Sequence, residues 1–234
     1  MSQISAKRFI EELEQHKNEH NIEKMKRFFK GSDPDTVCWG LDMKTVFQKA
    51  KQFDRMPLNE IETLLNSPCY EVRIGAVSIM DYQARKKITE EERKALFDLY
   101  MNKHDKINNW DFVDRAAPSV VGTYLLDKPR DILYDMARSG NMWERRTSIV
   151  STYAFIKKGE IDDTFRIAEI LVNDEEELVQ KAVGSWIREA GKKDEARLKD
   201  FLNRHASAMP RVTLRYAIEK FDRDTRQYYM SMGK

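Results

Sequence analysis

Apolar residues recur at intervals of three and four along nearly the whole chain. This spacing places side chains on one face of an α-helix. Phe9 and Leu13 show it near the start, and Val46 and Ala50 show it in the next segment. No stretch sustains the two-residue alternation of a half-buried strand. The pattern predicts an all-α fold.

Boundary signals divide this pattern into short helices. Thr89 to Glu92 form a capping box that opens a helix running to about Tyr100. Pro129 and Pro210 stand where a first helical turn would begin. Residues 31–40 differ, because glycine, proline and aspartate are concentrated there. This segment is predicted to be a loop or a short β-hairpin.

Several of the predicted helices resemble one another in sequence. Each carries an early cation followed by small or β-branched residues. The similar segments are residues 72–77, 145–150, 180–185 and 210–215, with a weaker copy at 115–117. The early cations recur roughly every 30–42 residues, the period of paired-helix repeats. Stacked pairs bury one continuous core and curve into a solenoid. We therefore expect residues 1–234 to form a single domain of stacked helix pairs with a concave face.

Five of the repeated cations would form a track if equivalent positions face one groove. They are Arg73, Arg115, Arg146, Lys181 and Arg211. A row of cations suits a phosphodiester backbone. Alternatively, these cations donate hydrogen bonds to the carbonyl groups at helix ends or pair with acidic residues of adjacent repeats. The net charge of +2 excludes a polycationic coat but allows a local basic groove.

Residues 108–115 concentrate the candidate chemistry at the start of a predicted helix. Trp110 and Asp114 are four residues apart and share a face, and Asp111 and Arg115 form a second such pair. An aromatic ring beside a carboxylate suits a flat, cationic, sugar-linked target. The alternative is a core tryptophan beside a helix-capping aspartate.

Composition limits the remaining possibilities. The chain has 234 residues, of which 41% are hydrophobic and 34% charged, as in a soluble globular protein. Cys38 and Cys69 form no metal or redox motif and indicate a reducing cytoplasm. The start of the chain lacks signal-peptide order, and no apolar run approaches the roughly 20 residues that span a membrane. His16 and His20 lack a metal-site motif, and we expect a monomer without metal or cofactor.

Three segments resemble the HEAT-like repeat DNA alkylation repair family. They are residues 109–114, residues 141–146 and residues 181–189, and the resemblance extends from about Phe9 to Phe221. It implies an all-α stack of helical repeats that wraps duplex DNA. Members of this family remove positively charged alkylpurines such as 3-methyladenine and 7-methylguanine.

The resemblance also implies roles for individual residues. Asp114 corresponds to the catalytic carboxylate and Trp110 to an aromatic wall. Arg146 and Arg188 correspond to arginines that contact phosphate near the lesion. Phe28 falls where the family can place a further aromatic ring at the cleft.

The chain departs from the family pattern at two positions. Asn109 stands where glycosylase members have an aromatic residue, and Ser185 stands where they have a tryptophan. Trp186 is about 100° further around the helix and should face the core. These departures favour a branch that binds damaged or branched DNA in a basic concave groove without effective base release. The alternatives are a monofunctional alkylpurine glycosylase that uses Asp114 and Trp110, and a solenoid scaffold for acidic proteins.

Overall fold

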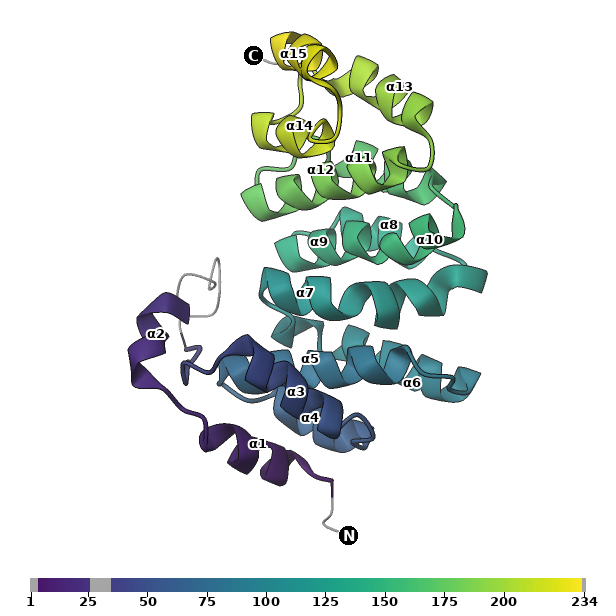
Figure 1. The fold of residues 1–234 in the computed structure, drawn as a ribbon. Coiled ribbons are helices and arrows are strands. Elements are labelled where there is room, and N and C mark those ends of the chain that lie inside the picture. Colours follow the sequence, from purple (N-terminus) through teal and green to yellow (C-terminus); the bar gives the residue numbers. More distant parts are fainter. Residues whose placement is uncertain (1–3, 26–34, 233–234) are drawn as a thin grey trace. The chain divides into compact units, whose positions relative to one another are not determined.

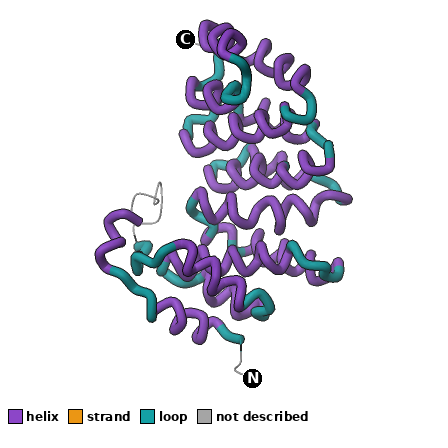
Figure 2. Tube along the Cα trace, in the orientation of Figure 1, coloured by secondary structure: helices purple, strands orange, loops and turns teal. Residues whose placement is uncertain are grey.

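The computed structural model describes residues 4–25 and 35–232, and these residues confirm the all-α prediction (Figure 2). They contain no β-strand. Residues 31–34 of the possible hairpin lie outside the described part. Within residues 35–40, Val37 forms an isolated parallel bridge with Cys69, which is not a hairpin pairing.

The chain forms two compact units, Met1–Tyr124 and Leu125–Lys234. The prediction of a single domain therefore stays a prediction. Among the described residues, no helix combines the length and the apolar character needed to cross a bilayer.

The first unit is built around one buried helix. Its helices are α1 (Ala6–Glu14), α2 (Glu19–Met25), α3 (Met43–Gln52), α4 (Leu58–Leu65), α5 (Tyr70–Ala84), α6 (Glu90–Asn102), the 3₁₀ turn η2 (His104–Lys106), α7 (Trp110–Ala116) and the π-helix η3 (Ala117–Gly122). Helix α5 contacts α1, α3, α4, α6 and α7 (Figure 1). Because neighbours surround it, α5 is buried along most of its length.

The second unit is a stack of paired helices. It contains the 3₁₀ turn η4 (Leu125–Asp127), α8 (Asp131–Ala137), α9 (Met142–Ser151), α10 (Tyr153–Lys158), α11 (Asp162–Leu171), α12 (Glu177–Gly191), α13 (Glu195–His205), α14 (Arg211–Ala217) and α15 (Arg223–Met232). Helix α8 pairs with α9 and α11 pairs with α12, while α12 also contacts α9, α13 and α14 (Figure 1). The similar sequence segments in α9, α12 and α14 thus belong to successive layers.

The predicted helix boundaries are largely confirmed. At the start of α6, the Thr89 hydroxyl accepts from the Glu92 N–H, and the Glu92 carboxylate accepts from the Thr89 N–H. Pro210 directly precedes α14, Pro129 lies two residues before the start of α8, and α12 ends at a glycine, Gly191. Local sequence therefore determines where several helices begin and end.

Small residues in the repeated segments permit close helix contacts. A Cβ atom added to Gly75 of α5 would lie 2.6 Å from the Phe9 ring of α1. A Cβ atom added to Gly184 of α12 would lie 2.4 Å from the Thr213 carbonyl oxygen of α14. The second contact is with backbone, which cannot rotate away. Close approach of α12 and α14 therefore requires glycine at position 184.

We expect Gly184→Ala to lower the free energy of unfolding by about 1–3 kcal/mol, because the added methyl group forces α12 and α14 apart. Gly140→Ala is the matched control, since an added Cβ at Gly140 meets nothing within 4 Å. Urea unfolding of both variants measures the difference. Equal stabilities would contradict the proposed requirement for close packing.

Candidate active site

Helix α7 presents the predicted aromatic and acidic residues from its first two turns. The Asn109 side chain caps α7 by accepting from the Trp110 N–H at 2.9 Å. Phe112 and Val113 face the interior and are fully buried. The opposite face of α7 carries Trp110 and Asp114, as helical spacing predicts.

This face opens onto a cavity of about 330 Å³ within the first unit. Its lining combines an apolar floor, an aromatic wall, two carboxylates and one guanidinium. The lining residues are Met43, Phe47, Tyr70, Ile74, Trp110, Asp111, Asp114 and Arg115. The structure thus places Asp114 and Trp110 in one cavity. Ligand sites commonly have this mixture of apolar surface and a few convergent polar groups.

Asp111 is held in the wall of the cavity by a hydrogen bond from the Tyr70 hydroxyl. Burial and, to a smaller extent, the nearby Asp114 charge raise its pKa to about 6, although a hydrogen bond from the Tyr70 hydroxyl opposes the rise. The other carboxylate oxygen, Oδ1, is buried without a hydrogen-bond partner among the described residues. The charge of this cavity therefore changes near neutral pH.

Tyr70 was not identified from the sequence. Its ring stacks on Phe112 at 5.4 Å between centroids, while its hydroxyl reaches Asp111. Burial raises the pKa of Tyr70, and the Asp111 charge adds to this effect, so the hydroxyl remains a donor. The sequence does contain a pattern that could have pointed to Tyr70. Helices α5 and α7 both begin with an aromatic residue followed by an acid, Tyr70-Glu71 and Trp110-Asp111.

Arg115 does not bond to Asp111, its predicted helical neighbour. Its Nε donates to the Ser78 hydroxyl at 3.2 Å, and its Nη2 lies 3.5 Å from the buried Asp81 carboxylate. The guanidinium also lies 4.8 Å from the ring centroids of Phe47 and Tyr82. Arg115 therefore forms part of the cavity wall and offsets the negative charge of the buried Asp81. Its contact with DNA stays a prediction.

The first turn of α5 fixes the segments around this cavity. The buried Glu71 carboxylate accepts N–H groups from residues 39–41 at distances of 2.7–3.2 Å. Arg73 is only 3% exposed and donates to Thr36 at 2.6 Å and Asn108 at 2.8 Å. Asn108 directly precedes the cap of α7. Arg73 thus ties the start of α7 to α5, and its predicted phosphate contact stays a prediction.

The predicted cations of the second unit also have protein partners. Arg146 is 6% exposed and donates to the Leu178 carbonyl. The remaining partners are Glu177 for Lys181, Glu219 and the Tyr216 carbonyl for Arg188, and the Met230 carbonyl for Arg211. These contacts agree with the alternative that the cations bind carbonyl oxygens and carboxylates of neighbouring helices. A role of these four residues in binding DNA stays a prediction.

Three other sequence predictions have separate outcomes. Trp186 was predicted to face the core. It is only half-buried, and its ring lies 4.9 Å from that of Tyr153. Phe28 lies outside the described residues. The segment containing Asp114 belongs to the first unit and those containing Arg146 and Ser185 to the second. Their meeting in one groove therefore stays a prediction.

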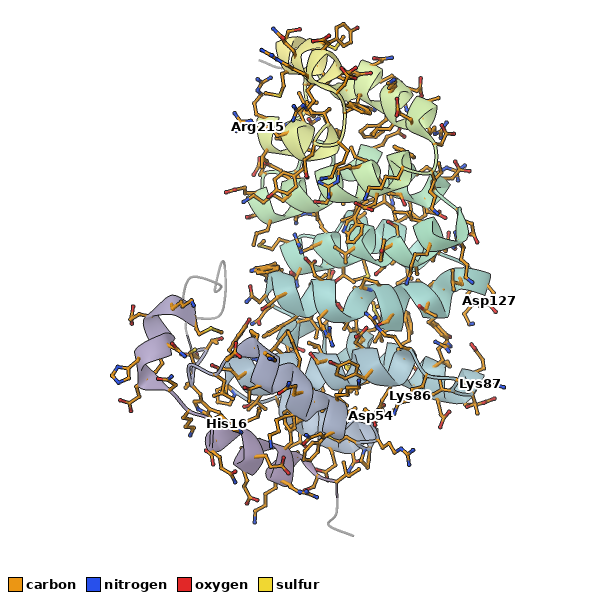
Figure 3. The ribbon with its side chains drawn as sticks, viewed as in Figure 1. His16, Asp54, Lys86, Lys87, Asp127 and Arg215 are labelled. Carbon is orange, nitrogen blue, oxygen red and sulfur yellow. The ribbon has the colours of Figure 1, made fainter. Side chains whose placement is uncertain are left out.

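A second cavity of the first unit lies away from Trp110 and Asp114. A larger cavity of about 650 Å³ lies at the far end of α5, where Lys86 pairs with Asp54 at 2.7 Å (Figure 3). Its walls are mostly apolar. Within the described part of the chain, no group of three or more histidine, cysteine, aspartate or glutamate residues is placed to hold a metal ion.

Comparison with known proteins identifies the family. A family model described as DNA alkylation repair enzyme matches residues 9–221. The chain belongs to the DNA alkylation repair family. A solved structure described as a predicted DNA alkylation repair enzyme from Enterococcus faecalis matches this family member with a TM-score of 0.70 and 19% sequence identity, covering 89% of this chain and 98% of that chain. This likeness concerns the fold. No curated protein matches the sequence.

Replacing Asp111 with asparagine should change how stability depends on pH. The raised pKa of Asp111 means that the folded wild type binds a proton more tightly than the unfolded chain. Asp111 therefore destabilises the wild type progressively as pH rises from about 4 to about 6, by about 3 kcal/mol in total. Asparagine can still accept from Tyr70 but carries no charge.

We expect Asp111→Asn to gain stability relative to the wild type as pH rises through this range. Urea unfolding at about pH 4 and about pH 7.5 measures the gain. The exposed Asp105 on η2 provides the control variant Asp105→Asn. A stability difference between Asp111→Asn and wild type that stays constant with pH would refute the assignment.

Proposed function

We propose that this protein recognises a cationic alkylated purine in DNA and hydrolyses its N-glycosidic bond. The observation that supports this proposal is the single cavity shared by Trp110, Asp111 and Asp114. An aromatic face and two carboxylates form a site for a flat cation. The Ser185 departure favoured a non-catalytic branch, but the cavity geometry favours the glycosylase.

The chemistry needs little more than electrostatic stabilisation. Alkylation at N3 or N7 gives the purine a positive charge and makes it a good leaving group. When the C1′–N bond breaks, its electron pair goes to the base nitrogen, and the base leaves neutral. The sugar becomes an oxocarbenium-like cation, which a carboxylate stabilises. Water then adds to C1′ and releases a proton, leaving an abasic site.

The two carboxylates have unequal positions for this reaction. Both carboxylates are half-buried at the same cavity, but Asp111 is held by the Tyr70 hydroxyl through one oxygen and its other oxygen is buried. We assign Asp114 the role of facing the developing sugar cation and orienting water. Asp111 contributes a second negative charge in the lining of the cavity. Trp110, also half-buried, supplies the aromatic face for the base.

A second candidate function is binding of branched DNA without base release. The specific observation in its favour is Ser185, which removes one aromatic ring expected in glycosylase members. A cation–π contact contributes about 0.5–2 kcal/mol, so this loss alone corresponds to roughly tenfold in rate or affinity. Such a loss weakens catalysis without abolishing it.

We expect Asp114→Asn to reduce release of 7-methylguanine from methylated duplex DNA by at least about 100-fold, since it removes the charge that faces the sugar cation. Chromatography of the released base measures the rate. Asp98→Asn on the exposed surface of α6 is the matched control and should retain wild-type activity.

The same experiment separates the two candidate functions. A wild-type protein that releases no base but binds a three- or four-way junction more tightly than duplex DNA would refute the glycosylase proposal and support the second candidate. Equal release by wild type and Asp114→Asn would refute the role of Asp114.

A further inference from the structure

Three arginines converge on a hollow between α14 and α15 at the end of the second unit. The hollow has a volume of about 440 Å³. Arg215 reaches it from α14, and Arg223 and Arg226 reach it from α15. We call these residues the C-terminal arginine triad. Apolar atoms of Ile218 and Met230 form part of the lining, which suits the alkyl stems of arginine.

The triad differs from several other arginines of this unit in lacking partners. Arg215, Arg223 and Arg226 are all exposed, and their side chains form no hydrogen bond or ion pair with any described residue. By contrast, Arg130 binds Asp163, Arg145 binds Asp174 and Arg204 binds Glu169. Three unpaired guanidinium groups at one hollow leave their donors available to an external anion.

The local geometry holds the triad in place. Arg223 and Arg226 are three residues apart and share a face of α15. Arg211, one turn before Arg215, donates to the Met230 carbonyl at 2.8 Å and thereby fastens α14 to α15. Figure 3 shows Arg215 projecting outward from α14. The predicted cation of this repeat, Arg211, therefore positions the helices, while the next turn carries the exposed charge.

The nearby carboxylates do not cancel this charge. Glu219 also lines the hollow, but Lys220 and Arg188 bind it and lower its pKa. Asp222 accepts the N–H groups of Asp224 and Thr225 at the start of α15. Lys220 and Arg188 offset the Glu219 charge, so the three arginines outnumber the remaining nearby carboxylates, Asp222 and Asp224.

We propose that the C-terminal arginine triad binds phosphate groups of the DNA backbone. The guanidinium fork matches two phosphate oxygens and makes stronger hydrogen bonds than a neutral donor. Contacts to phosphate position a protein on DNA without reading base sequence. This inference rests on the proposed function only in taking DNA as the ligand, and it is independent of catalysis by Asp114.

The test is binding of a fluorescently labelled duplex by anisotropy at several salt concentrations. The triple variant Arg215→Gln, Arg223→Gln, Arg226→Gln should bind at least about tenfold more weakly at about 100 mM salt. The slope of log affinity against log salt should become shallower by about 2–3, as expected for two to three lost phosphate contacts.

The matched control carries the same charge change at paired arginines. Arg138→Gln, Arg197→Gln and Arg204→Gln together remove three exposed cations of the same unit that already have protein partners. This control should bind DNA within about threefold of wild type. Equal effects of the two triple variants on affinity and salt slope would overturn the proposal, because net charge alone would then explain the loss.

Two further outcomes distinguish this proposal from others. If wild type releases no methylated base but the triad variant still loses duplex binding and salt slope, the glycosylase function fails and the triad proposal stands. If wild type binds poly-glutamate through the triad while duplex binding is unaffected by the triple variant, the triad proposal is overturned in favour of an acidic protein partner.

Discussion

The organisation of the candidate site depends on a buried polar turn at the start of α5. Tyr70, Glu71 and Arg73 are all nearly inaccessible to solvent, yet each satisfies a group from another segment. Tyr70 holds Asp111, Glu71 holds the backbone of residues 39–41, and Arg73 holds Thr36 and Asn108. Buried polar groups are costly unless they are paired, so these contacts favour one arrangement of the segments. The position of α7 against α5 follows from that arrangement.

Two requirements compete within the cavity. A site for a cation needs negative charge, but burial of carboxylates is unfavourable. In this cavity the Tyr70 hydroxyl and the Phe112 N–H donate hydrogen bonds to the Asp111 carboxylate, which offsets part of this cost. Arg115 is directed instead to Ser78 and Asp81. It therefore does not pair with Asp111, which has no cationic partner among the described residues, as the proposed binding of a cationic base requires.

Arginine has two different roles in this protein. Arg73, Arg146 and Arg211 occupy the repeated cation position and bind backbone or side-chain oxygens of neighbouring segments. Their fork of donors stabilises contacts between successive elements. Arg215, Arg223 and Arg226 lie outside that repeated position and are exposed. A repeat pattern thus marks the cations that hold the stack, while unpaired cations mark a surface suited to an external anion.

The sequence by itself determined the all-α fold, many helix ends, the family and the pairing of Trp110 with Asp114 on one face. These properties depend on the spacing of residues within one helix, on capping residues and on small residues between neighbouring helices. All of these can be recognised in short stretches of sequence. Tertiary structure decided the partners of Arg115 and Arg73, the involvement of Tyr70 and Phe47, and the burial that shifts the pKa of Asp111. Those properties depend on residues about 35–70 positions apart that meet only after packing, so spacing along the chain does not encode them.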